Sequence, residues 1–138
     1  MNFTIEKRIK ADPEKVWKLI SDFSFSPGQG VDVRVIDPGT ANGQNLVREV
    51  KIGKMVLTEK IESVESGKSF SYAIIKGTPT KSYKGKGQIG KNGNETIITW
   101  SGDFVPKIPF TGAIIGMIAK KSVSKYLDAV LSKGGLNK

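Results

Sequence analysis

The chain of 138 residues contains no cysteine and no histidine. Without cysteine there are no disulfides and no thiolate nucleophiles, and without histidine there are no His-based catalytic triads. Zinc sites built from Cys and His ligands are excluded for the same reason. Any acid–base chemistry must therefore use carboxylates, tyrosine, lysine or arginine. No group of carboxylates has metal-ligand spacing, so we expect no metal and no other cofactor.

Long apolar runs are also missing. The most apolar stretch, residues 110–119, falls far short of the ~20 residues that a membrane-spanning helix needs. The first residues lack the apolar core of a signal peptide. We therefore expect a cytoplasmic protein without a membrane span, either a monomer or a homodimer.

The length fits one domain, residues 1–138, large enough to bury roughly 70% of its unfolded surface. The global feature that stands out is a formal charge of +9, from 22 basic and 13 acidic residues. Such a charge attracts polyanions or anionic ligands. A lysine-rich surface that simply faces water is the more common origin of such a charge.

The hydrophobic pattern predicts a strand, a helix, six further strands and a long final helix. Asp12 and Pro13 are typical of a helix start, and Gly134 of a helix stop. Residues 24–30 are expected to form a loop or a short second helix. The expected strands are 2–10, 31–37, 45–52, 55–65, 68–76, 80–91 and 94–104, and the expected helices are 13–23 and 111–132.

This order predicts an α+β fold in which a seven-stranded antiparallel sheet curves around the C-terminal helix. Along the chain, one strand is followed by one or two helices, six strands and the final helix. The long helix is the element large enough to cover one face of the sheet. Glycine at positions 85, 87 and 102 would let the sheet bend.

Short turns predict the register of the strands. A two-residue turn at Gly53-Lys54 pairs Ile52 with Met55, and so places Arg48 opposite Glu59. Counting from the turn at Ser66-Gly67 places Glu59 opposite Ile74, and Ile61 opposite Tyr72.

Two further turns extend the predicted register. A turn at Asn92-Gly93 pairs Lys91 with Asn94, and this places Trp100 opposite Gly85 and Ile98 opposite Gly87. A turn at residues 76–79 places Tyr72 opposite Tyr83, and Tyr83 opposite Gly102.

The predicted register sorts the strand residues into an apolar inner face and a polar outer face. Four polar residues break the pattern on the inside, namely Arg48, Glu59, Tyr72 and Tyr83. They either satisfy one another and fix the register, or line a partly wet pocket between sheet and helix. The inner set is Leu46, Arg48, Val50, Leu57, Glu59, Ile61, Phe70, Tyr72, Ile74, Tyr83, Ile98, Trp100 and Phe104.

The start of the final helix favours the pocket. Gly112, Ala113, Gly116 and Ala119 are small, so they would leave space against a bent sheet instead of filling it.

Residues 11–23, ADPEKVWKLISDF, resemble the first helix of the START-like, or SRPBCC, superfamily. The later series of Arg48, Glu59, Tyr72 and Tyr83, followed by Thr99-Trp100 with Phe104 and Pro106, is similar to the polyketide cyclase/dehydrase-type branch. The resemblance covers nearly the whole chain and implies a helix-grip fold. It also implies that Arg48, Glu59, Tyr72, Tyr83 and Trp100 line the cavity. Members with enzymatic activity often use further polar or histidine residues there, and this chain has no histidine.

The leading hypothesis is a protein that binds or carries a small hydrophobic molecule with a polar or anionic end. Arg48 would meet an acid or a carbonyl, the tyrosines would donate hydrogen bonds, and the remaining residues would supply apolar contact. The expected ligand-binding residues are Arg48, Leu57, Glu59, Phe70, Tyr72, Ile74, Tyr83, Trp100 and Phe104.

Two alternatives stay open. A cyclase or dehydratase would use Glu59 as a general base, although an opposing Arg48 stabilises the carboxylate and so weakens it as a base. A nucleic-acid or ribosome partner is suggested by the net charge and by the lysines of residues 80–91 and of the last helix. Few exposed aromatic residues are expected to assist such binding by stacking.

Overall fold

The computed structural model describes residues 1–136, in which seven strands form one antiparallel sheet with two helices. The strand order across the sheet is β1-β7-β6-β5-β4-β3-β2. The element bounds lie within three residues of those predicted from the sequence. The strands are β1 (Asn2–Ile9), β2 (Val31–Asp37), β3 (Val47–Ile52), β4 (Met55–Glu65), β5 (Ser69–Lys76), β6 (Thr80–Asn92) and β7 (Glu95–Pro106), and the helices are α1 (Pro13–Ile20) and α2 (Gly112–Lys133).

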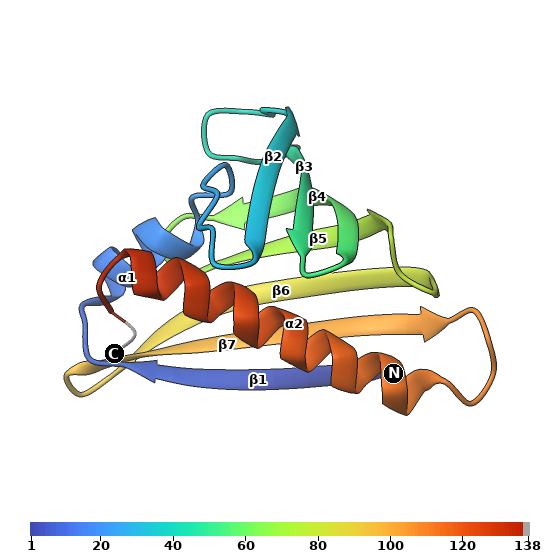
Figure 1. The fold of residues 1–138 in the computed structure, drawn as a ribbon. Coiled ribbons are helices and arrows are strands. Elements are labelled where there is room, and N and C mark those ends of the chain that lie inside the picture. The colour runs from blue at the N-terminus through green and yellow to red at the C-terminus, as the bar shows by residue number, and fades with distance from the viewer. Residues whose placement is uncertain (137–138) are drawn as a thin grey trace.

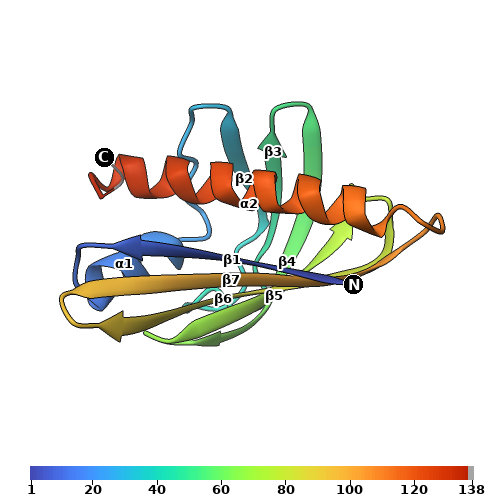
Figure 2. The same ribbon diagram turned by 90° about the horizontal axis from the view of Figure 1, so that it is seen from below.

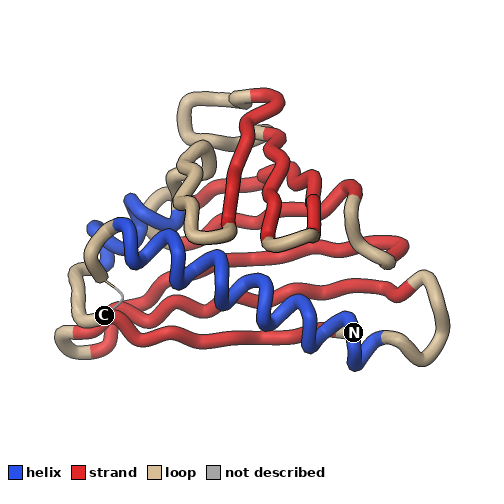
Figure 3. Tube along the Cα trace, viewed as in Figure 1, coloured by secondary structure: helices blue, strands red, loops and turns tan. Residues whose placement is uncertain are grey.

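The sheet bends strongly, and α2 lies along its concave side. In Figure 1, β2, β3 and the adjoining end of β4 stand steeply above the nearly horizontal β6, β7 and β1, and α2 crosses in front of them. The perpendicular view in Figure 2 shows that α2 keeps to one side of the sheet along its length. The tube in Figure 3 shows the same two layers without side chains. The predicted α+β architecture is therefore confirmed.

The short helix α1 begins where the sequence predicts, with Pro13 in its first turn and Asp12 in an extended conformation before it. The Asp12 side chain makes no capping hydrogen bond. The helix ends at Ile20, and the backbone N–H of Ser21 bonds to the carbonyl of Trp17 at 2.9 Å. Residues 24–30 form a loop and not the second helix that was the alternative.

The long helix α2 ends in a Schellman motif. The N–H of Gly135 bonds to the carbonyl of Ser132 at 3.0 Å, and the N–H of Leu136 bonds to that of Leu131 at 2.9 Å. This motif requires a residue with positive φ directly after the helix cap. Gly135, with φ of 76°, takes that position. Gly134, predicted as the C′ residue, is instead the C-cap, and Gly135 takes the C′ position.

The central register is confirmed at the predicted pairs. Arg48 pairs with Glu59 across β3 and β4, as Ile52 pairs with Met55 next to the turn. Glu59 also pairs with Ile74, and Ile61 with Tyr72.

The turn predicted at Ser66-Gly67 is wrong, however, because Glu65 pairs with Ser69, and a register shift between Ile61 and Ser63 compensates for the extra residue.

In the β5–β6 and β6–β7 pairs, the observed partners are shifted by two residues from the predicted ones. Trp100 pairs with Gly87 and Ile98 with Ile89. Tyr72 pairs with Gly85 and Tyr83 with Phe104. A shift of two residues leaves every side chain on its predicted face, because strand side chains alternate with a period of two. The prediction of which residues face inward is therefore correct for these strands, although the predicted pairing partners are wrong.

Both errors have a local cause. The β6–β7 turn has Gly93 and Asn94 as its central residues, with Asn92 paired to Glu95. Gly93 has φ of 63°, as a first central residue of a type II′ turn requires. The β5–β6 connection is not a tight turn, because β5 and β6 stop pairing at Ala73 and Lys84.

Glycines on the inner face let aromatic rings lie directly on the backbone. A Cβ atom at Gly85 would lie 2.2 Å from Cζ of Tyr72, and one at Gly102 would lie 2.2 Å from Cε1 of Phe3. At Gly87 the nearest rings are those of Phe70 and Trp100. These bare positions therefore give the rings room on the inner face of the sheet. That they also allow the sheet to bend stays a prediction.

Neither helix within residues 1–136 combines the length and the apolar character that crossing a membrane would require.

Candidate functional site

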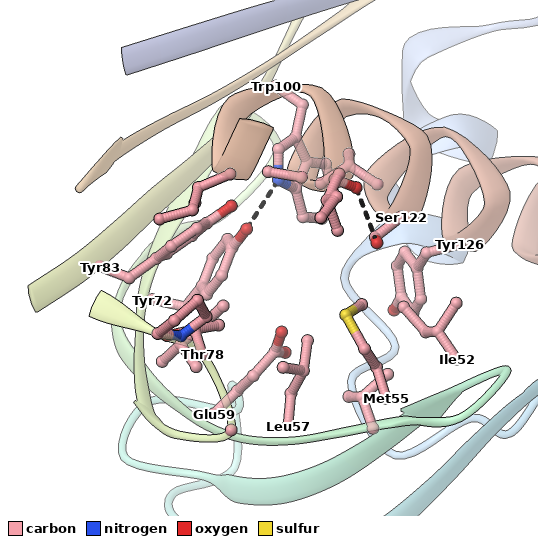
Figure 4. A pocket seen from close by; sticks show the side chains of 18 of the residues that line it. Ile52, Met55, Leu57, Glu59, Tyr72, Thr78, Tyr83, Trp100, Ser122 and Tyr126 are labelled. Carbon is pink, nitrogen blue, oxygen red and sulfur yellow. Dashed lines mark hydrogen bonds between the residues drawn. The ribbon is translucent and has the colours of Figure 1, made fainter. Parts of the chain in front are cut away.

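A cavity of about 220 Å³ lies between the concave face of the sheet and α2 (Figure 4). Its walls come from the middle strands and from one side of the helix, and most of the lining side chains are apolar. The lining residues are Arg48, Val50, Ile52, Met55, Leu57, Glu59, Tyr72, Ile74, Gly77, Thr78, Pro79, Tyr83, Trp100, Ile115, Ile118, Ala119, Ser122, Val123 and Tyr126.

The cavity is exposed at one end and buried at the other. Gly77 and Pro79, in the β5–β6 connection, and Ile118 on α2 line the cavity and are exposed to solvent. Arg48 and Tyr126 line it and are buried. We therefore place the mouth of the cavity between the β5–β6 connection and the first half of α2.

The buried end holds an ion pair. Nε of Arg48 donates to Oε1 of Glu59 at 3.1 Å, and Nη2 of Arg48 lies 3.0 Å from the same oxygen. Nη1 of Arg48 donates to the backbone carbonyl of Phe23 and to the hydroxyl of Tyr126, both at 3.0 Å. The guanidinium also lies against the rings of Tyr126 and Phe23, at 5.1 Å and 5.8 Å from their centroids. The charge of Arg48 is thus neutralised and its donors are largely occupied.

One oxygen of Glu59 is left for another partner. Both contacts with Arg48 use Oε1, and the structure of residues 1–136 gives no protein hydrogen bond to Oε2. The same residues contain no buried side-chain oxygen or nitrogen without a partner, so Oε2 must be accessible. Figure 4 shows the carboxylate of Glu59 pointing into the open space of the cavity. Oε2 is therefore a hydrogen-bond acceptor that faces the cavity.

Two tyrosines lie beside this ion pair. Nε1 of Trp100 donates to the hydroxyl of Tyr72 at 2.9 Å (Figure 4). Because that oxygen accepts from the indole, the Tyr72 proton is directed elsewhere. Tyr83 lines the same wall, and its ring stacks on Phe104 with centroids 6.0 Å apart. The Tyr72 hydroxyl also hydrogen-bonds to that of Tyr83, so the proton of Tyr83 remains to donate toward the interior.

The electrostatics keep these groups in one protonation state near neutral pH. Burial raises the pKa of Tyr72 well above its ordinary value, and Tyr83 and Glu59 raise it further. Burial and Glu59 also raise the pKa of Tyr83. Burial alone would lower the pKa of Arg48, but Tyr126 and Glu59 raise it overall. Both tyrosines are therefore neutral donors, and Arg48 is charged.

The structure brings together seven of the nine residues predicted to form the site. Phe70 and Phe104 are buried but do not line the cavity. The ring of Phe70 contacts those of Phe23 and Trp100, with centroids 4.9 Å and 5.2 Å apart. The seven lining residues are Arg48, Leu57, Glu59, Tyr72, Ile74, Tyr83 and Trp100.

Apart from Ala119, sequence reasoning missed the helical side of the cavity. Tyr126 accepts a hydrogen bond from Arg48, and Ser122 and Ile115, on the same helix, also line the cavity. Ile115, Ala119, Ser122 and Tyr126 are spaced by four, three and four residues, which places them on one face of a helix. This spacing is a signal that could have identified Tyr126.

The small residues of α2 contribute less to the cavity than expected. Ala119 lines it, but Ala113 is exposed to solvent. Gly112 lies against the side chain of Met1, and Gly116 has Phe104 at 3.8 Å from the position of a Cβ atom. Only one of the four residues thus leaves space where the cavity lies.

The lysines of β6 have no exposed aromatic side chain beside them on the neighbouring strands β5 and β7. Lys84 pairs with Glu62 at 3.2 Å. The aromatic rings of the neighbouring strands, Tyr72, Tyr83 and Trp100, are buried on the opposite face.

Solved structures of similar fold cover almost the whole chain. A START superfamily protein from Mycobacterium smegmatis superposes with a TM-score of 0.77 at 13% identity, over 97% of each chain. The protein XoxI from Bacillus cereus gives 0.74 at 22% identity, over 96% of this chain and 94% of that one. Norcoclaurine synthase from Thalictrum flavum, in complex with dopamine and hydroxybenzaldehyde, gives 0.76 at 15% identity, over 94% and 83%. At these identities the similarity shows the fold, which is the helix-grip fold expected from the sequence.

Among curated protein sequences, none matches this chain. The family described as "Polyketide cyclase / dehydrase and lipid transport" matches residues 1–133. The match covers both helices and all seven strands. The chain therefore belongs to the polyketide cyclase/dehydrase and lipid transport family.

Proposed function

We propose that the protein binds a small, mainly apolar molecule with a polar end, held in the cavity between the sheet and α2. The observation that carries the proposal is an apolar cavity whose buried end holds Glu59 and Tyr83 with hydrogen-bonding capacity left for a ligand. The family description, which includes lipid transport, supports it.

The volume of the cavity limits the size of the ligand. An engineered apolar cavity of about 150 Å³ binds benzene, so about 220 Å³ suits a molecule of one or two rings or a short chain. Burying ~300 Å² of such a ligand contributes about 7 kcal/mol, and association costs at least ~4 kcal/mol. The remainder corresponds to binding near the millimolar range. Tighter binding therefore needs the polar groups at the buried end.

Those polar groups favour a neutral ligand end over an anionic one. The charge of Arg48 is already neutralised by Glu59, and a ligand carboxylate would lie beside the Glu59 carboxylate. A ligand hydroxyl could instead donate to Oε2 of Glu59, and a carbonyl could accept from a neutral tyrosine. A phenol, an alcohol or a ketone fits this arrangement better than an acid.

Tryptophan fluorescence can test the proposal, because Trp100 lines the cavity and Trp17 does not. A Trp17→Phe variant reports on Trp100 alone. We expect naphthol to quench this emission with saturation, and naphthoate to bind at least several-fold more weakly. Absence of saturable quenching by either compound, together with no small molecule co-purifying by native mass spectrometry, would contradict the proposal.

Two substitutions on the same helix separate the cavity from the surface. Ala119 lines the cavity and is buried, whereas Ala113 is exposed. Ala119→Leu fills part of the cavity and should abolish quenching by naphthol. Ala113→Leu, which adds the same atoms to the outside, should leave binding unchanged. Equal binding by both variants would place the ligand elsewhere.

A reaction of the cyclase or dehydratase kind is the second candidate, and the accessible Oε2 of Glu59 supports it. That oxygen could accept a proton from carbon beside a carbonyl, with a neutral tyrosine donating to the developing enolate. The ion pair with Arg48 occupies Oε1 and leaves Oε2 for this role. Glu59→Gln should abolish turnover of any substrate that the protein converts, and full turnover by this variant would eliminate the candidate.

A further inference from the structure

Five large apolar side chains are exposed where β7 connects to α2 and along the first two turns of that helix. We call this surface the apolar tip. Phe110 is fully exposed, and the other four are about half exposed or more. The residues are Ile108 (62%), Phe110 (102%), Ile114 (57%), Met117 (56%) and Ile118 (46%).

The apolar tip adjoins the mouth of the cavity. The N–H of Lys107, at the start of the β7–α2 loop, bonds to the carbonyl of Pro79 in the β5–β6 connection at 3.1 Å. Both segments lie at the same end of the molecule in Figures 1 and 2. Ile118 belongs to both surfaces, because it lines the cavity and is exposed.

The loop holds Phe110 away from the protein. Phe110 has φ of 68°, a conformation that is strained for a bulky residue and that persists only when its surroundings enforce it. Pro109 precedes it, and the hydroxyl of Thr111 donates to the carbonyl of Ile108 at 2.6 Å. The exposed ring is thus a property of an ordered loop.

The chain segment that forms the apolar tip carries only positive charge. From Phe104 to Leu127 the sequence contains no acidic residue. Four lysines in this segment are exposed, and the structure of residues 1–136 pairs none of them with a carboxylate. They are Lys107, Lys120, Lys121 and Lys125.

From these observations we infer that the apolar tip docks on the surface of a lipid bilayer rich in anionic lipids. Exposed apolar side chains flanked by lysines match the acyl and headgroup layers of such a surface. A second copy of the chain fits less well, because a twofold contact through the tip would bring the two sets of lysines together. Docking would place the mouth of the cavity against the bilayer, so that a hydrophobic molecule could pass between them without crossing water.

Co-sedimentation of the full chain with vesicles tests the inference. We expect binding to phosphatidylcholine vesicles that contain about one-quarter phosphatidylserine, and little binding to phosphatidylcholine alone. Phe110→Ser should weaken binding roughly tenfold. The control is Ile36→Ser, which removes a side chain of 51% exposure on β2, away from the tip, and it should bind like the wild type.

A second pair of variants tests the charge. Lys120→Glu with Lys121→Glu should weaken binding by about 25-fold or more, at about a factor of five for each lysine near the surface. Lys10→Glu with Lys91→Glu makes the same charge change at the opposite end of the sheet, where residues 9 and 91 both pair with Thr96. This control should bind nearly as well as the wild type, apart from a small loss from net charge.

The inference would be overturned if the wild-type protein co-sediments with neither kind of vesicle. It would also be overturned if the Phe110→Ser variant binds the vesicles as strongly as the wild type. A dimer that Phe110→Ser dissociates, without any vesicle binding, would assign the tip to self-association instead. The Ala119→Leu variant, in which part of the cavity is filled, should bind vesicles like the wild type. Vesicle binding is thus tested separately from ligand binding in the cavity.

Discussion

Nη1 of Arg48, on the sheet, donates a hydrogen bond of 3.0 Å to the hydroxyl of Tyr126, on α2. The two residues are 78 positions apart in the chain, and both line the cavity. Arg48 also bonds to the carbonyl of Phe23, in the segment after α1. One guanidinium thus joins β3, β4, the segment after α1, and the long helix at the buried end of the site.

The first prediction concerns this bond. Tyr126→Phe removes the hydroxyl and leaves a buried N–H of Arg48 without its partner, which costs about 1–3 kcal/mol. Urea denaturation should show that loss in the free energy of unfolding. Tyr83→Phe is the control, because its hydroxyl accepts no bond from Arg48 and its removal should cost less. A larger loss for Tyr83→Phe than for Tyr126→Phe would contradict the prediction.

The ion pair gives a second prediction. Arg48→Met leaves the Glu59 carboxylate at the buried end without a cation, and we expect about 3–5 kcal/mol of destabilisation. Adding Glu59→Leu should recover part of that loss, because no unpaired charge remains. The surface pair of Arg34 and Glu49, 3.3 Å apart, is the comparison, and Arg34→Met should cost less than about 1 kcal/mol. Additive losses in the double variant would show that Arg48 and Glu59 do not interact.

The tyrosines predict how stability responds to alkali. The pKa values of Tyr72 and Tyr83 are raised in the folded protein, mainly by burial, whereas unfolded tyrosine titrates near pH ~10. The folded state therefore holds these protons more tightly. Their contribution to stability is complete below pH ~10 and is lost as the pH rises toward the folded-state values. The free energy of unfolding should fall steadily above pH ~10.

Tyrosinate absorbance can check the alkaline behaviour. Tyr72 and Tyr83 should ionise together with unfolding and not before it. Tyr72→Phe should reduce the slope of unfolding free energy against pH above ~10. Ionisation of both residues in a protein that stays folded would contradict the assignment.

A fourth prediction uses the glycines. Gly85→Ala would place a Cβ atom 2.2 Å from the ring of Tyr72, so the ring must move and the protein should lose about 1–3 kcal/mol. Gly90, on the same strand, has nothing within 4 Å of that position. Gly90→Ala should be neutral or slightly stabilising. Thermal unfolding of both variants gives the comparison, and equal melting temperatures would contradict it.

The sequence predicted the fold and the faces of the strands well because both depend on alternation, which is a local property. Arg48 opposite Glu59 was also predictable, since a two-residue turn joins their strands. The partners of Trp100 and Tyr83 were two residues away from their expected positions. The cause is the choice of central turn residues at 93–94 and the early end of pairing between β5 and β6.

The helical half of the site was harder to predict than the strand half. The rotation of α2 about its axis depends on how it packs in the curved sheet, and no turn fixes it. Tyr126 was therefore missed although it bonds to Arg48. Phe70 and Phe104 were included because they share the inner face, yet they pack into the aromatic core. The location in the cytoplasm and the single-domain organisation stay predictions.

The position of β1 has a consequence for how the chain acquires its structure. β1 is made first, but its only neighbour among the described strands is β7, and Asn2 pairs with Asp103. During synthesis the first strand must wait for about a hundred further residues before it can be paired, and pairing over such separations slows folding. The nascent chain therefore carries an unpaired edge until late, when it is open to aggregation or chaperone binding. Substitutions that weaken β1 should reduce yield in cells more strongly than their effect on the stability of the finished protein would suggest.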